Sequence, residues 1–293
     1  MDRSGLELNS PRLPTWLRRP LSHGPGVNRV RGLMSDLSLH TVCESARCPN
    51  LSECFSKGTA TFMILGDVCT RRCGFCAIDQ GKPLPVDEAE PEHVAQAALE
   101  MGLRHVVITA VARDDLKDGG AGQFAKVIEA IRKKEKAILI EVLISDLRGN
   151  EVHLETILAA GPDILNHNLE TVVRLHPWVR PQARYERSIE LLRRAKEKKE
   201  TMWTKSGLML GLGETPEEVV EVLKDLRGAG CQLLTLGQYL QPASDRLKVV
   251  EFIHPDQFKW YEEKAYEMGF SSVASGAFVR SSYHAEENFR KFN

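Results

Sequence analysis

Between Thr61 and Met268 the chain alternates six times between a short apolar run and a stretch whose apolar residues recur at helical spacing. This alternation constrains the fold more than any other feature, because strands joined by helices run parallel, with each helix crossing over the sheet. The runs are apolar at nearly every position, as in strands covered on both faces. The expected strands are residues 61–66, 105–110, 137–145, 164–169, 206–212 and 232–240.

Six strand–helix units predict an α/β fold, a partial (β/α)6 TIM-like barrel with N-terminal and C-terminal extensions, because a complete barrel has eight units. A doubly wound sheet is the alternative. In both folds, ligands bind at the carboxyl ends of the strands. We expect an N-terminal arm and extension over residues 1–58, the barrel over 59–270 and a C-terminal segment over 271–293.

Residues 1–40 contain several prolines and glycines and show no lasting helical period, so we expect an irregular, extended arm. Its basic side chains suit either a solvated surface tail or docking to a partner. These side chains are Arg3, Arg12, Arg18, Arg19, Arg29 and Arg31.

The charge balance and the hydropathy pattern exclude some function classes. The 39 Lys and Arg residues are matched by 40 Asp and Glu residues, which gives no basic surplus for nucleic acid binding. No apolar run reaches the roughly 18 residues that a membrane span needs. The sequence begins Met1-Asp2-Arg3 without the apolar core of a signal peptide, so we expect a cytoplasmic location.

Six of the seven cysteines lie between Cys43 and Cys76, and the seventh, Cys231, is expected to be an inert core thiol. Disulfides are rare in the cytosol, and an odd number of thiols does not suit a disulfide framework. Crowded thiols in a reducing compartment favour metal ligation or redox chemistry.

Cys69, Cys73 and Cys76 form a C-x3-C-x2-C loop directly after the first predicted strand. Three thiolates from one short loop can hold three corners of a cubane iron–sulfur cluster, which leaves the fourth iron open to a cofactor. A structural zinc knuckle is the alternative, although zinc sites are usually closed by four ligands, commonly in paired C-x2-C units.

Cys43, Cys48 and Cys54 form a second triad with the much less common C-x4-C-x5-C spacing. This triad also supplies three thiolates. A fourth ligand must therefore come from elsewhere in the chain or be missing.

The first of these motifs, with Phe75 before its last cysteine, resembles the signature of the radical S-adenosylmethionine superfamily. The resemblance implies that the open iron chelates the amino and carboxylate groups of S-adenosylmethionine. It also implies that one-electron reduction cleaves this cofactor to a 5′-deoxyadenosyl radical.

The second triad, with its flanking residues 44–47 and 49–50, resembles the auxiliary-cluster motif of the lipoyl synthase family. Residues 280–283, Arg-Ser-Ser-Tyr, are similar to that family's terminal motif, in which a serine ligates the auxiliary cluster. The resemblance implies that Ser282 is this ligand, with Ser281 as the second choice. It covers residues 12–286, and departs from the family pattern at Gln123, Arg246, Lys248 and Ala277, which affects substrate contacts and loop shape rather than the cluster ligands.

The resemblance implies radical insertion of two sulfur atoms at C6 and C8 of a protein-bound octanoyl-lysine, with two [4Fe-4S] clusters and S-adenosylmethionine as cofactors. It makes Cys43, Cys48, Cys54 and Ser282 the ligands of the auxiliary cluster, whose sulfide is inserted into the substrate. The implied partners are a lipoyl domain or glycine-cleavage H protein, a flavodoxin or ferredoxin as electron donor, and a cluster-repair carrier, with the enzyme itself a monomer. The alternatives are a two-cluster enzyme of the biotin synthase or methylthiotransferase type and a zinc-binding module without catalysis.

Three further residues are expected to contact the cofactor. Asn168 and Glu170 stand at the end of the fourth predicted strand, where they can bond the ribose hydroxyls and the methionyl group. A helix cap or salt bridge is the alternative. Arg184 can pair with the cofactor carboxylate as a bidentate fork, or be an ordinary surface arginine.

Overall fold

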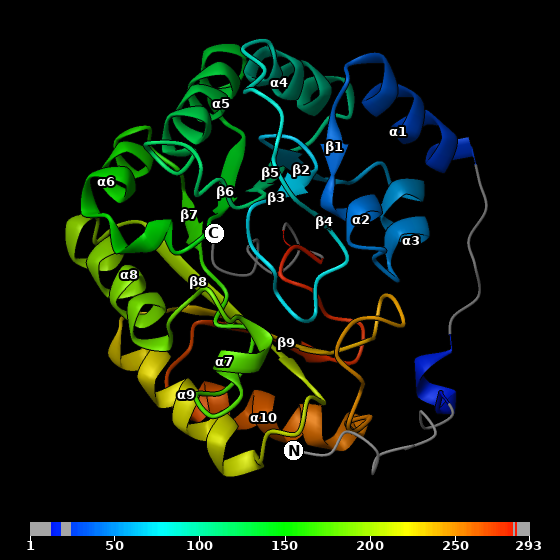
Figure 1. Cartoon of the computed structure of the whole chain (residues 1–293), viewed down its shortest axis with the longest axis vertical. Coiled ribbons are helices and arrows are strands. Elements are labelled where there is room, and N and C mark those ends of the chain that lie inside the picture. Colours follow the sequence, from blue (N-terminus) through cyan, green and yellow to red (C-terminus); the bar gives the residue numbers. More distant parts are fainter. Residues whose placement is uncertain (1–12, 19–24, 284, 286–293) are drawn as a thin grey trace.

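The computed structural model describes residues 13–18, 25–283 and 285. Its main sheet has eight strands in the order β1-β2-β5-β6-β7-β8-β9-β10, and all neighbouring strands are parallel except the pair β1 and β2. Figure 1 shows these strands curving around a central space with helices on the outside. The strands are β1 (His40–Thr41), β2 (Thr61–Ile64), β5 (His105–Ala110), β6 (Leu139–Leu143), β7 (Ile164–Asn166), β8 (Trp203–Leu210), β9 (Leu233–Gln238) and β10 (Ser272–Gly276).

The outer layer consists of six helices that cross between consecutive parallel strands (Figure 1). The strands follow one another in chain order, without the reversal of a doubly wound sheet, so the prediction of a partial barrel is confirmed. The crossover helices are α4 (Glu90–Glu100), α5 (Ala121–Lys134), α6 (Glu151–Ala159), α8 (Tyr185–Lys198), α9 (Pro216–Gly228) and α10 (Pro255–Glu267).

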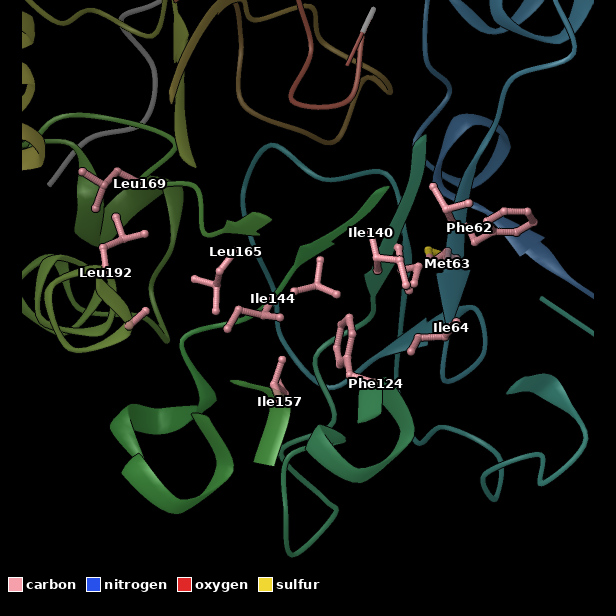
Figure 2. Close-up of a cluster of buried hydrophobic side chains, with 14 of the residues drawn as sticks. Phe62, Met63, Ile64, Phe124, Ile140, Ile144, Ile157, Leu165, Leu169 and Leu192 are labelled. Carbon is pink, nitrogen blue, oxygen red and sulfur yellow. The ribbon is translucent and has the colours of Figure 1, made fainter. Parts of the chain in front are cut away.

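The core lies between the strands and this outer layer of helices. Phe62, Met63 and Ile64 of β2 are at most 1% exposed, and Phe124 of α5 and Ile157 of α6 pack from the helical side (Figure 2). Burying one such side chain contributes about 1.5–3 kcal/mol. The continuous apolar runs in the sequence thus correspond to strands that are covered on both faces.

One parallel strand was not predicted. Strand β10 pairs residue by residue with β9, so the sheet continues past residue 270. Its sequence, Ser-Val-Ala-Ser-Gly, is small and partly polar, and three of its five residues are half-buried, which explains why no apolar run marked it. The division of the chain into three domains stays a prediction.

The prediction of an irregular arm over residues 1–40 is wrong for its second half. Residues Pro25–Asp36 form α1, and Val27, Val30 and Met34 bury one face of it at helical spacing. Gly26 allows close approach to α3 (Leu51–Ser56), because a Cβ there would lie 2.8 Å from the Ser56 carbonyl oxygen. Arg3, Arg12 and Arg19 lie outside the described residues.

Candidate functional site

The C-x3-C-x2-C motif lies on a loop that follows β2 and runs through the centre of the barrel mouth (Figure 1). Its base is closed by the short parallel pair β3 (Val68–Cys69) and β4 (Asp79–Gln80). Cys69, Cys73 and Cys76 are free and half-buried. We call residues 69–76 the radical loop.

The radical loop is anchored by a buried charge network. Arg71, 5% exposed, contacts Asp114 through Nε (2.7 Å) and Nη2 (2.9 Å), and Asp146 through Nη2 (2.6 Å). Burial opposes the charge of Arg71, but these two carboxylates outweigh it and raise the pKa of the guanidinium. Burial likewise opposes the charge of Asp146, yet Arg71 holds its pKa down at about 2. The network therefore stays ionised and fixes the start of the loop.

Gly74 and Phe75 dock the other side of the radical loop. The Gly74 N–H donates to the Val179 carbonyl (2.9 Å), and the Gly74 carbonyl accepts from the Leu247 N–H (3.0 Å). A Cβ at Gly74 would lie 2.9 Å from Leu247 Cδ1, so a side chain here would push the loop away. Phe75 packs against the small apolar cluster of Val179, Leu212 and Tyr239.

Burial keeps two of the thiols of the radical loop, Cys73 and Cys76, in the protonated form. Burial is the main cause that raises the pKa of Cys73 to about 11 and that of Cys76 to about 12. The neighbouring cysteines raise both pKa values further. Loading a metal centre must therefore displace protons from these thiols.

Asn168 and Glu170 lie at the carboxyl end of β7, beside the radical loop. Glu170 has a φ of +69°, which is uncommon for a residue other than glycine and costs about 1–3 kcal/mol. Two backbone bonds to β8 hold it there, to the Gly207 carbonyl (3.0 Å) and from the Met209 N–H (2.8 Å). Burial raises the pKa of Glu170, and its charge in turn raises the pKa values of Cys73 and Cys76.

The Asn168 side chain also fits a polar ligand. It is 8% exposed, and its Nδ2 donates to Glu170 Oε1 (3.1 Å). Its Oδ1 is buried and has no hydrogen-bond partner in the part of the chain that the structure describes. Because an unsatisfied buried acceptor costs free energy, this atom is a natural place for a donor such as a ribose hydroxyl.

The structure separates Arg184 from this rim and brings Arg180 to it. Arg184 is exposed and precedes α8 as its N-cap residue. Arg180 is 8% exposed and donates to the Asn168 carbonyl (2.5 Å). Its charge counteracts the raised pKa values of Cys73 and Glu170. Sequence reasoning missed Arg180, which follows the short helix α7 (His176–Val179) and carries no periodic signal.

The second cysteine triad lies on α2 (Val42–Ser45), α3 and the turn between them. The Thr41 hydroxyl caps α2 by accepting from the Glu44 N–H (3.3 Å), and Arg47, with φ +52°, makes the turn. Burial is the main cause that raises the pKa of Cys43 to about 12 and that of Cys54 to about 11. The Cys48 thiol raises both pKa values further.

A cavity of about 130 Å³ adjoins this triad, and Ser282 lines it together with all three cysteines. One water-sized probe fills about 10–15 Å³ by this measure, so the cavity has room for a group much larger than water. The Thr61 hydroxyl donates to Ser282 Oγ (2.7 Å) across 221 positions of sequence. We call this the auxiliary cavity; Asn50, Glu53, Thr59, His105, Arg280 and Tyr283 are among its other lining residues.

The two triads fit iron–sulfur clusters by donor chemistry, and the auxiliary cavity gives the second triad room for one. No three His, Cys, Asp or Glu side chains close around a single ion anywhere in residues 13–18, 25–283 and 285. The fit rests instead on two separate sets of three soft thiols, which suit cluster corners. Each set leaves the fourth corner of a cluster open. Asn168 and Glu170, at the end of β7, lie beside the first set, where they could orient a cofactor, and Ser282 lies beside the second set.

Other groups have structural roles. His167 is buried, and its ring nitrogens contact the Ile144 carbonyl (2.8 Å) and Ser188 Oγ (2.9 Å). Burial lowers its pKa to about 3, so it is neutral. Cys231 is fully buried, as expected of a core thiol, and burial raises its pKa to about 12. No helix within the described residues is long and apolar enough to cross a membrane.

Two departures from the family pattern are now placed. Gln123 donates to the Asp87 carbonyl (3.0 Å) and to Glu90 Oε2 (2.8 Å), so it joins α5 to the start of α4. The Glu90 carboxylate also accepts from the Leu65 N–H (3.0 and 3.1 Å), ahead of the radical loop. Arg246 and Lys248 flank Leu247, which contacts the radical loop directly.

Comparison with known proteins agrees with this geometry. The family model of the radical SAM superfamily matches residues 63–226, which include the radical loop and the rim of β7. Solved structures share the fold at 14% identity: methylornithine synthase (PylB), with a TM-score of 0.57 over 86% of this chain and 75% of that chain, and HydG, a maturase of the [FeFe]-hydrogenase, with 0.57 over 84% and 66%. A partial barrel with this loop thus defines a radical SAM protein.

The N-terminal region and full-length relatives narrow the class. The family model described as the N-terminal domain of lipoyl synthase matches residues 4–48. Lipoyl synthases from Caldanaerobacter subterraneus and Alkaliphilus metalliredigens are each 53% identical, covering 94% and 97% of this chain and 96% and 98% of the relative. The lipoyl synthase of Nitrosococcus oceani is 56% identical over 94% of this chain and 85% of its own. The chain belongs to the lipoyl synthase family.

Proposed function

We propose that this protein inserts two sulfur atoms, at C6 and C8, into an octanoyl chain on a lysine of a carrier protein and gives the dihydrolipoyl group. One observation carries the assignment to this reaction. Ser282 lines the same cavity as Cys43, Cys48 and Cys54, although it lies more than two hundred positions away in sequence. A chain that only generated a radical would not need this second, serine-closed site.

The chemistry requires a radical because the C–H bonds at C6 and C8 have no useful acidity. When bound, S-adenosylmethionine and the two [4Fe-4S] clusters supply a 5′-deoxyadenosyl radical and the sulfide that is transferred. Cys69, Cys73 and Cys76 hold the first cluster. Cys43, Cys48, Cys54 and Ser282 hold the second, the source of sulfur.

The remaining residues of the site bind, orient and exclude water. Asn168 and Glu170 bond the polar groups of the cofactor, and Arg180 supplies positive charge beside them. Arg180 replaces Arg184 as the arginine best placed for this task, because Arg180 is buried at the rim and Arg184 is exposed. Phe75, with its apolar neighbours, keeps water from one side of the radical loop.

The partners follow from the reaction. The substrate carrier is a lipoyl domain or a glycine-cleavage H protein, and the first cluster needs a one-electron donor such as a flavodoxin or ferredoxin. Because the second cluster gives up its sulfide, a carrier protein must rebuild it. We place the protein in the cytoplasm as a monomer, with residues 1–58, 59–270 and 271–293 as its three parts.

The test uses anaerobically purified enzyme, S-adenosylmethionine, dithionite and an octanoyl-lysine peptide. Cys73→Ala should lose the first cluster and with it formation of 5′-deoxyadenosine. Cys48→Ala should keep some cofactor cleavage but give no lipoyl product. Cys231→Ala, which removes a thiol from the core, is the matched control and should keep both activities.

Each alternative has its own outcome. Robust 5′-deoxyadenosine formation by Cys73→Ala contradicts the assignment of the radical loop. A wild-type enzyme that cleaves the cofactor but leaves the octanoyl peptide unchanged belongs with biotin synthase or methylthiotransferase chemistry. A protein that binds zinc and contains neither iron nor acid-labile sulfide is a non-catalytic module.

A further inference from the structure

The two adjacent serines of the C-terminal motif bond to different sides of the barrel. Ser281 Oγ accepts from Asn168 Nδ2 (2.6 Å), at the rim beside the radical loop. Ser282 Oγ accepts from Thr61 Oγ1 (2.7 Å), at the auxiliary cavity. Two successive residues therefore connect the two sites directly.

The partner of Ser281 is itself held firmly. The Asn168 carbonyl accepts from Arg180 (2.5 Å), and its Nδ2 is shared between Ser281 and Glu170 Oε1 (3.1 Å). Asn168 is 8% exposed. Its side chain therefore offers Ser281 a fixed attachment point rather than a mobile one.

Other contacts attach the same segment to the auxiliary side and to β9. Asn50 donates to the Phe278 carbonyl (2.7 Å), and the Tyr283 hydroxyl donates to Glu53 (3.1 and 3.2 Å). The Val279 carbonyl lies so close to Gly237 of β9 that a Cβ there would be 2.1 Å from its oxygen. The Ser281 bond adds the link to the radical side.

We propose that Ser281 is a positioning residue that, through Asn168, sets the place of the auxiliary site relative to the radical site. The inference rests on the proposed function, in which a radical formed on the octanoyl chain would meet a sulfide of the cluster that Ser282 and the cysteines would hold. Reacting atoms must approach within about 3–3.5 Å, and a misplacement of about 1 Å can cost 10²-fold in rate. Without the Ser281 bond, cofactor cleavage should continue while carbon–sulfur bond formation falls behind.

The experiment measures the ratio of 5′-deoxyadenosine to lipoyl product in single-turnover reactions. Ser281→Ala should raise this ratio about three- to tenfold, the factor that one neutral hydrogen bond provides. Its iron and sulfide content should match that of the wild type, because no cluster ligand is lost. Ser281→Thr keeps a hydroxyl and should restore the wild-type ratio.

Two further variants separate positioning from a general structural effect. Ser275→Ala removes a hydroxyl of β10 that donates to the Phe258 carbonyl (2.7 Å) on the outer helix layer, so its ratio should stay at the wild-type value. In the Asn168→Ala background, adding Ser281→Ala should raise the ratio no further, because the two residues act through one bond.

The outcomes are distinct. A wild-type ratio in Ser281→Ala, or additive effects of the two substitutions, overturns the positioning role. Loss of about half the iron in Ser281→Ala also overturns it and makes Ser281 a ligand. Absence of lipoyl product from the wild-type enzyme itself instead rejects the proposed function.

Discussion

At the scale of single residues, the most consequential atom is the Ser282 hydroxyl oxygen. It is a hard, weak donor placed among three thiols, and it bonds to Thr61 rather than to a charged group. A soft metal centre binds a thiolate more tightly than a hydroxyl. The choice of serine therefore suits a centre that must come apart during turnover.

The first residue-scale prediction follows from this difference. Ser282→Cys should keep the auxiliary iron but slow release of lipoyl product, whereas Ser282→Ala should retain the radical cluster and lower product yield by about tenfold or more. Iron content and single-turnover product yield measure both effects. Wild-type yield from both variants would move the ligand assignment to Ser281 or to His284, which lies outside the described residues.

Residue identities were predictable where a motif spacing marks them and not where only the fold brings them in. The six clustered cysteines, Ser282, Asn168, Glu170 and Arg184 were named from the sequence, and their roles stay predictions. The structure places Ser282 beside Cys43, Cys48 and Cys54, and it buries Arg180, which was not named, against the Asn168 carbonyl while Arg184 is exposed. Four positions separate these arginines, and only the packing of α7 decides which one turns inward.

At the scale of elements, the radical loop is held in place chiefly by Arg71. Its guanidinium joins the loop to Asp114 after β5 and to Asp146 after β6. Asp146 is fully buried and also pairs with Arg187 of α8 (3.0 Å). Segments that follow β5 and β6 therefore bind the Arg71 side chain, and α8 joins the same network through Asp146.

Arg71→Met should therefore destabilise both the fold and the loop. It leaves the buried Asp146 with one partner fewer, and breaking a buried pair costs about 3–5 kcal/mol. Arg71→Lys should rescue little, because an ammonium lacks the planar fork. Thermal unfolding and the iron content of the radical cluster are the measurements. Arg72→Met, an exposed neighbour, is the control and should shift stability by no more than about 0.5 kcal/mol.

The strands and helices that bury the most apolar side chains were the easiest to predict from the sequence. Six buried strands were predicted from apolar runs in the sequence, and the helices between them were predicted from amphipathic stretches. Helix α1 was missed because prolines and glycines precede it, although Val27, Val30 and Met34 carried a helical period. Strand β10 carried no such signal, because its residues are small and partly polar and three of the five are only half-buried.

At the scale of the whole molecule, a buried ion pair stands inside the barrel. Lys205 of β8 donates to both oxygens of Glu141 on β6 (2.8 and 3.1 Å), and Asn166 of β7 donates to the same carboxylate (2.8 Å). Glu141 is fully buried. Burial opposes its charge, but Lys205 and His105 (3.4 Å) together outweigh that effect and lower the pKa of Glu141 to about 2.

Removing one partner of this pair should cost far more than removing both. Lys205→Met removes the main countercharge of the buried Glu141 and should destabilise by about 3–5 kcal/mol, whereas Lys205→Met with Glu141→Leu should recover most of that loss. The apparent melting temperature should fall by roughly 2–4 °C per kcal/mol. Lys264→Met, which breaks an exposed pair with Glu267 on α10, should leave it nearly unchanged. Equal losses in the single and double variants would contradict this account.

The auxiliary cavity also sets an order of assembly. The radical loop and its rim draw on residues between 69 and 247, but the auxiliary cavity joins residues 43–61 to residues 280–283 and 285. Contacts between such distant segments form late in folding, because the entropy of closing the intervening chain must be overcome first. We therefore expect the auxiliary cavity, the proposed site of the sulfur-donating cluster, to be enclosed only after the barrel has formed. In a partly folded chain the thiols of Cys43, Cys48 and Cys54 are already close in sequence, but Ser282 does not yet lie beside them.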